Sequence, residues 1–191
     1  MGRQDKRDLL GKVDEAGGKA RQAPRRAPQE CGDVGLKIGR DGTWYYQNSP
    51  IGRKPLVKLF ASVLRQEADG QYYLVTPAER VLIRVEDAPF VAVEMNSEDS
   101  GREQRLSFRT TIDEVVHAGR DHPLSFRTEP DGSVTPFVLI REGLKARLAR
   151  SVYYELVAAA TSEARGGKDE LGVWSGGIFF RFPAPQESGE D

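Results

Sequence analysis

The chain is poor in the residue types that most often carry out chemistry. Among its 191 residues are one cysteine, Cys31, and two histidines, His117 and His122. A single cysteine can form neither an internal disulfide nor a CxxC metal or redox pair, and it fits a reducing compartment. The sequence therefore excludes a disulfide-stabilised fold and a CxxC-based site.

Long apolar runs are missing as well. The opening residues, MGRQDKRDLLGKVDEAGGKA, contain no signal-peptide core. No later stretch approaches the roughly 18 uninterrupted apolar residues that a membrane-spanning helix needs. Acidic residues near the start, such as Asp5 and Asp8, argue against an organelle transit peptide. We therefore expect a cytoplasmic protein that makes no membrane contact.

The chain also lacks an excess of charge of either sign. It has 28 lysines and arginines against 29 aspartates and glutamates, which gives a formal net charge of -1. Such a balance argues against a specific nucleic-acid partner and leaves only local basic pockets open. Residues 1–33 are polar, mildly basic and broken by Gly and Pro, so we expect a disordered arm there and a similar tail at 184–191.

The middle of the chain shows regular apolar patterns. A helix is predicted around 56–64, where apolar residues follow the spacing i, i+3, i+4, i+7 and i+8. A short strand, TWYY, precedes this helix. Several segments rich in Val, Ile, Tyr and Phe follow in close succession, which predicts an antiparallel meander. A second helix is predicted from about 144 to 160, before a last strand, GIFFRF.

An internal repeat is the strongest organisational signal. IGRKPLVKLFA at Ile51–Ala61 aligns without gaps to LARSVYYELVA at Leu148–Ala158. Two amphipathic helices can resemble each other by chance, but the matching arginines and flanking strands favour duplication. We expect an α+β fold with duplicated strand–helix–strand units and meander-like sheets, one unit at 34–95 and the other at 96–183.

Arg53 and Arg150 occupy the same place in the two repeats, where each helix is expected to begin. A cation is unfavourable at a helix N-terminus, so each arginine should have an anionic or carbonyl partner. That partner is either a phosphate or carboxylate bound in a shared cleft, or an internal group of the fold.

The glycine-rich segment GGKDELGVWSGG offers a second candidate. Ser175, Gly176 and Gly177 could present backbone amides to an anion, although paired glycines also form simple β-turns. The segment is neither a P-loop nor a GxSxG elbow. Trp44 and Trp174 either stack on a planar base or pack in the core.

The two histidines, with Asp113, Glu114 and Asp121, form the one cluster that resembles metal-site or triad material. Its spacing matches no fingerprint, so we assign no metal and no catalytic residue. A hydrolase would need His117 or His122 within hydrogen-bond reach of Ser175.

Longer strings match a known family. The sequence strongly resembles the bacterial domain of unknown function family 1285 over about residues 33–182, in the strings DGTWYYQNSPIGRKPLVKLFASVL, DGQYYLVTPAERVLIRVEDAPFVAVEM, LSFRT, HPLSFRT, PFVLIREGLKARLARSVYYELV and GVWSGGIFF. The resemblance implies a duplicated core and a C-terminal half superficially like a pleckstrin-homology fold. It implies no established enzymatic activity, but a nucleotide-based ligand at the domain interface and a part in bacterial signal transduction.

Together, these observations predict a non-enzymatic ligand-binding or regulatory protein without a cofactor. Its ligand would be a nucleotide-like anion between the two units. The predicted ligand-binding residues are Arg53, Arg150, Trp44, Trp174, Ser175, Gly176 and Gly177. A protein-interaction scaffold is the alternative, and a hydrolase is a weaker one.

Overall fold

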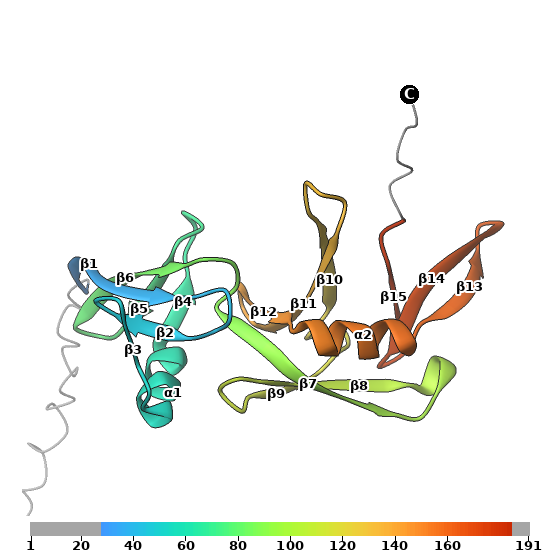
Figure 1. Cartoon of the computed structure of the whole chain (residues 1–191), viewed down its shortest axis with the longest axis horizontal. Helices are drawn as coiled ribbons and strands as arrows, with labels where there is room; N and C mark the ends of the chain where they lie inside the picture. The colour runs from blue at the N-terminus through green and yellow to red at the C-terminus, as the bar shows by residue number, and fades with distance from the viewer. Residues whose placement is uncertain (1–27, 185–191) are drawn as a thin grey trace, which may run out of the picture.

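The computed structural model of the chain describes residues 28–184. Most of the expected arm, residues 1–27, and the tail residues 185–191 lie outside this range. Two six-stranded sheets and one three-stranded sheet make the fold mostly β, with two short α-helices (Figure 1). The prediction of an α+β fold therefore overestimated the helical content. Neither helix of the described part is long and apolar enough to cross a membrane.

The first sheet consists of two antiparallel meanders joined through the helix α1 (Lys54–Val63). Its central pair, β1 and β6, is parallel and closes the two meanders into one sheet. β1 takes in the last residues of the expected arm. The strands are β1 (Gln29–Ile38), β2 (Trp44–Tyr46), β3 (Ser49–Pro50), β4 (Leu64–Gln66), β5 (Tyr72–Val75) and β6 (Glu79–Val85).

The second sheet repeats this plan with two further meanders. Its central pair, β7 and β12, is again parallel. A turn of 3-10 helix, Gly101–Glu103, connects β7 to β8. The strands are β7 (Phe90–Glu98), β8 (Arg105–Thr110), β9 (Val115–His117), β10 (Leu124–Thr128), β11 (Val134–Arg141) and β12 (Leu144–Leu148).

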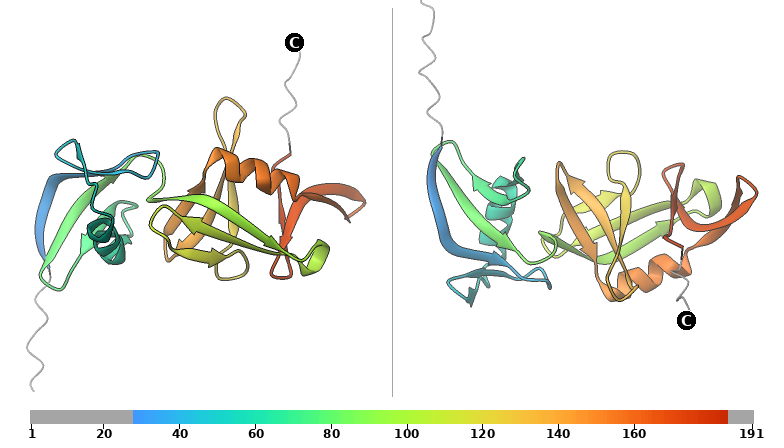
Figure 2. Two further views of the ribbon diagram at one scale, coloured as in Figure 1. Left: turned by 60° about the horizontal axis from the view of Figure 1, so that its bottom comes forward. Right: turned by 90° about the horizontal axis from the view of Figure 1, so that it is seen from above.

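A fifth meander completes the chain as a separate sheet. It follows α2 (Arg150–Ala158) and contains β13 (Thr161–Arg165), β14 (Lys168–Ser175) and β15 (Ile178–Arg181). We call β1–β6 with α1 the first unit and β7–β15 with α2 the second unit. In both views of Figure 2 the two units lie side by side and their sheets curl like half-barrels.

The predicted repeat fits the structure as a meander–helix–meander motif. α1 lies between the meanders β1–β3 and β4–β6, and α2 lies between β10–β12 and β13–β15. The predicted all-antiparallel meander is wrong at two places, because β1 with β6 and β7 with β12 run parallel. The expected unit boundary at 95/96 lies within β7, whereas the change of sheet comes between β6 and β7.

The second predicted helix begins later than expected. Residues 144–148 form β12, in which buried Leu144, Ala146 and Leu148 alternate with the more exposed Lys145 and Arg147. This two-residue period is that of a strand with one face toward the core. α2 then covers only Arg150–Ala158 and buries Val152 and Leu156.

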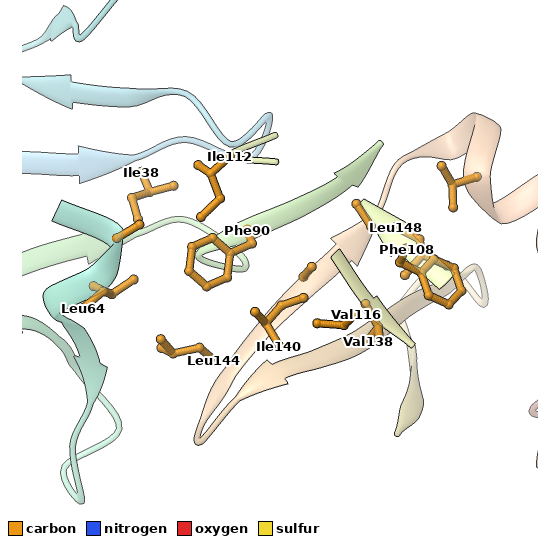
Figure 3. Packing of buried hydrophobic residues seen from close by; sticks show 14 of the residues in the cluster. Ile38, Leu64, Phe90, Phe108, Ile112, Val116, Val138, Ile140, Leu144 and Leu148 are labelled. Carbon is orange, nitrogen blue, oxygen red and sulfur yellow. The ribbon is translucent and has the colours of Figure 1, made fainter. Parts of the chain in front are cut away.

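One continuous apolar core connects the two units. Ile38 and Leu64 come from the first unit and belong to the same buried cluster as Phe90, at the start of β7. Figure 3 shows the labelled side chains running from one unit into the other. The members drawn there are Ile38, Leu64, Phe90, Phe108, Ile112, Val116, Val138, Ile140, Leu144 and Leu148. The units therefore share their interior.

Ion pairs cross the same junction at its surface. Lys54 and Lys58 of α1 lie 2.7 and 2.8 Å from the carboxylate of Asp113, in the turn between β8 and β9. Nearby, Arg141 of β11 pairs with Glu114 and also donates to the carbonyl of Ala61 in α1. The two lysines hold the pKa of Asp113 down, from its ordinary 3.8 to about 2.

We expect Phe90→Ala to destabilise both units together. Phe90 is 1% exposed, and truncating a buried phenylalanine costs about 3–5 kcal/mol. Hydrogen exchange followed in urea at one strand of each unit, β6 in the first and β11 in the second, should give one shared midpoint before and after the substitution. Two separate midpoints would show that the units unfold independently.

The Asp113 contacts should make stability depend on pH. Because the folded-state pKa is depressed, their contribution is present above about pH 4 and is lost as the pH falls toward about 2. In urea titrations, Asp113→Asn should lower the free energy of unfolding at about pH 6, with a smaller difference near pH 2. The double variant Lys54→Met/Lys58→Met should behave alike; a difference independent of pH would contradict this assignment.

Candidate functional site

A groove of about 1040 Å³ lies in the second unit, over the helix α2. Its walls are the β10–β11 hairpin on one side and β14, β15 and residues 182–184 on the other. In Figure 1 the β10–β11 and β13–β14 hairpins extend to the same side of α2. We call this cavity the α2 groove. It lies between the meanders β10–β12 and β13–β15, which belong to different sheets.

Positive charge in the α2 groove is only partly neutralised. Arg150, at the first position of α2, donates through Nε to the Tyr154 hydroxyl at 3.0 Å and has no carboxylate partner among residues 28–184. Lys168 likewise makes no ion pair within the described part of the chain. Arg181 pairs with Glu170 at 3.0 Å. The groove thus offers two cations to an incoming anion.

Aromatic and apolar side chains line the same cavity. The rings of Tyr153 and Tyr154 stack at 6.3 Å with a 19° angle between their planes. Three large hydrophobic side chains of the groove are unusually exposed: Tyr154 at 57%, Leu171 at 52% and Val157 at 41%. Exposed apolar surface of this kind, bordered by charge, is typical of a binding site.

Arg53 and Arg150 do not share a cleft. Arg53 caps α1 in the first unit, where its backbone carbonyl accepts hydrogen bonds from the amides of Leu56 and Val57. Its side chain is exposed and does not line the α2 groove. Only Arg150 of the predicted ligand-binding residues lies in that groove.

Both tryptophans are core residues. Trp44 is 2% exposed and stacks on Phe60 at 6.2 Å. Trp174 is also buried, donates its indole N–H to Glu163 at 2.9 Å and lies beneath Arg102. Neither indole lines the α2 groove.

Ser175 and its glycines join the third sheet to the second. The fully buried Ser175 hydroxyl donates to the carbonyl of Ala118 at 2.7 Å and accepts from the amide of Leu106 at 2.9 Å. Gly176 and Gly177 form the β14–β15 turn with φ of +56° and +73°, a conformation that favours glycine. The Gly176 amide donates to Gln104 at 3.1 Å. The Ser175 hydroxyl and the Gly176 amide are therefore used in hydrogen bonds within the fold.

The two histidines lie elsewhere. His117 is exposed on β9, and the Nδ1 of His122 bonds to the Leu139 carbonyl at 3.0 Å. The Ser175 hydroxyl hydrogen is directed to Ala118, and neither imidazole bonds to that hydroxyl. Within residues 28–184, no three histidine, cysteine or acidic side chains are grouped to hold a metal ion.

A second, smaller cavity of about 420 Å³ lies between the units. This junction pocket is lined by Tyr72 of the first unit, by Asp87 of the connector between β6 and β7, and by Phe126, Arg127 and Phe137 of the second unit. Asp87 has a side chain only 4% exposed and lies 2.8 Å from Arg127. Arg127 also pairs with Glu129, at 2.7 Å. The arginine of this pocket is therefore already paired with two carboxylates.

Several residues of both cavities carry weak sequence signals. Lys168 stands in the glycine-rich segment, whose pattern is that of a turn, and Tyr153 and Tyr154 resemble ordinary core aromatics. Asp87 lies between two strand patterns, and nothing in its neighbours indicates burial. For β12, the strand that carries Arg147, the sequence signal is the alternation of apolar Leu144, Ala146 and Leu148 with polar residues.

We expect Ser175→Ala to weaken folding. Losing the hydroxyl leaves the buried Leu106 amide without its acceptor, which costs about 1–3 kcal/mol. Urea denaturation should show this loss, whereas Ser62→Ala on the exposed face of α1 should change stability by under about 0.5 kcal/mol. A catalytic role for Ser175 would instead appear as a lost hydrolytic activity with stability unchanged.

Comparisons with known proteins agree on one family. The chain matches the model for the N-terminal domain of DUF1285, a domain of unknown function, over residues 24–88, and that for the C-terminal domain of DUF1285, a protein of unknown function, over residues 89–182. No curated protein matches the chain.

Two solved structures are similar. A DUF1285 family protein from Silicibacter pomeroyi DSS-3 is 41% identical, with a TM-score of 0.73, covering 83% of this chain and 86% of that one. A DUF1285 family protein from Shewanella baltica OS155 is 27% identical, with a TM-score of 0.52, covering 66% of this chain and 92% of that one. The chain belongs to the DUF1285 family.

Proposed function

We propose that this protein is a non-enzymatic regulatory module that binds a nucleotide-like anion in the α2 groove. The observation that supports this most strongly is the position of Arg150. Its guanidinium faces a large cavity and lacks a carboxylate partner in the described chain. A phosphate or carboxylate would supply that partner through charge-assisted hydrogen bonds.

The aromatic side chains give the groove a place for a planar group. Tyr153 and Tyr154 are adjacent to the cation, and Phe126 and Phe182 make an edge-to-face pair at 5.1 Å in the groove wall. An exposed ring of this kind gains contact area when a planar base stacks on it. The combination of cations and rings favours an anion with an aromatic part over a bare inorganic ion.

The proposed site lies within the second unit, whereas the sequence predicted a ligand between the two units. In the junction pocket Arg127 is already paired with Asp87 and Glu129, so an anion there would have to displace internal carboxylates. In the α2 groove no such exchange is required at Arg150. A part in bacterial signal transduction and a cytoplasmic location remain within this proposal. The likeness of the C-terminal half to a pleckstrin-homology fold stays a prediction, and the proposed site does not depend on it.

A protein-interaction scaffold is the second candidate. It is favoured by the exposed apolar side chains of Tyr154, Val157 and Leu171, which would suit a peptide as well as a small ligand. Val157→Ser would separate the two cases, because it removes apolar surface while leaving both free cations in place. A peptide partner should lose most from Val157→Ser, and a nucleotide most from Arg150→Ala.

The test is a thermal-shift screen with ATP, cyclic dinucleotides, pyrophosphate and small carboxylates, followed by calorimetric titration of each hit. A ligand that binds only the native state raises the melting temperature by mass action. Arg150→Ala should weaken binding by about 10- to 100-fold, the loss expected for one hydrogen bond to a charged group. Its own melting temperature should change little, since the side chain is exposed.

Arg53→Ala is the matched control, because it removes the equivalent arginine of the first repeat. It should leave affinity unchanged. Equal losses from both substitutions would contradict the α2 groove as the site. No shift with any compound would favour the scaffold.

A further inference from the structure

Arg147 of the α2 groove also contacts both the connector and the first unit. It lies on β12, lines the groove and is partly exposed. Its Nη2 donates to the backbone carbonyl of Arg40 at 3.1 Å, and its Nε lies 3.4 Å from the Asp87 carboxylate. This Nε is buried, yet it has no partner in hydrogen-bond geometry among the described residues. The guanidinium is thus held incompletely where it is.

The contacts of Arg147 are among those that hold the two units together. Asp87 belongs to the short connector between β6 and β7. Arg40 follows β1, and its amide donates to Glu86 of the same connector at 3.0 Å. Any movement of Arg147 toward the groove would therefore loosen the contact between the first unit and β12.

A second residue connects the two cavities. Phe126 of β10 lines both the α2 groove and the junction pocket, and its neighbour Arg127 pairs with Asp87. The wall of the groove and the wall of the junction pocket are consequently the same strand. A ligand that displaces Phe126 on one side alters the pocket on the other.

We infer that Arg147 couples anion binding in the α2 groove to the packing of the first unit against the second. A bound anion attracts the Arg147 guanidinium and competes with Asp87 and the Arg40 carbonyl for it. This inference rests on the proposed function, because it requires an anion in the groove. The inference extends the proposed function, because anion binding would change the packing at the junction between the units.

Thermodynamic reciprocity gives the first test. If an anion weakens the Arg147–Asp87 contact, then weakening that contact must strengthen anion binding by the same factor. Asp87→Asn should therefore raise the affinity for pyrophosphate, measured by calorimetry, by about 5-fold or more, the lower end of typical allosteric coupling.

Glu129→Gln is the matched control for charge. Glu129 and Asp87 both pair with Arg127, but only Asp87 contacts Arg147. Equal gains from Asp87→Asn and Glu129→Gln would show a general electrostatic effect and would overturn the coupling. An unchanged affinity in Asp87→Asn would overturn it too.

The second test measures the units directly. Spin labels at Ala68→Cys in the first unit and Glu103→Cys in the second, with Cys31→Ser, report the distance between them. Pyrophosphate should shift or broaden this distance distribution. Arg147→Met should produce a similar change without pyrophosphate, whereas Arg84→Met, which removes an exposed arginine of β6, should not.

The outcomes separate the two proposals. If pyrophosphate binds and Arg150→Ala weakens it, but the distance distribution stays constant, the α2 groove stands and the coupling fails. If neither pyrophosphate nor any nucleotide of the screen binds, the proposed anion site fails and the coupling with it. If Arg147→Met and Arg84→Met change the distance distribution alike, the change reflects a general loss of stability and contradicts the inference.

Discussion

The parallel pairing of β12 with β7 determines how the second unit is built. β12 has one edge left after it pairs with β11, and it gives that edge to β7. In the first copy of the repeat, the corresponding meanders close on each other through β1 and β6. In the second copy the equivalent strands are β10 and β15, which do not pair, so β13–β15 remain a separate sheet. The α2 groove is the space between the two meanders that this leaves apart.

The same pairing places Phe90 where the interiors of the two units meet. β7 begins at the connector, and its first residues lie beside β12 on one side and the first unit on the other. The connector therefore has to be short, and its Asp87 is buried as a consequence. Burying a carboxylate is tolerated only with cationic partners, which Arg127 and Arg147 provide. Packing, connector and ion pairs thus follow from one strand pairing.

Local patterns predicted the local features of the fold. The apolar spacing around α1 and the alternation in β8 come from neighbouring residues, so a sequence reveals them. The repeat was visible for the same reason. The two parallel pairs were not, because each joins residues about 50 positions apart in the sequence, such as Gln29 with Glu79 and Phe90 with Ala146. The repeat also singled out Arg150, which lines the α2 groove. The burial of Trp174 and Ser175 could not be predicted, because it depends on the docking of β14 against Ala118 and Leu106.

The central parallel pairs also set an order for folding. Hairpins within each meander need only close contacts along the chain, whereas a parallel pair has to close a long loop. In the first sheet, Gln29 meets Glu79, and in the second, Phe90 meets Ala146. During synthesis β1 can complete its sheet as soon as β6 has been made. β7 likewise keeps one open backbone edge until β12 has emerged, and such intervals are when a nascent chain is most exposed to wrong strand partners.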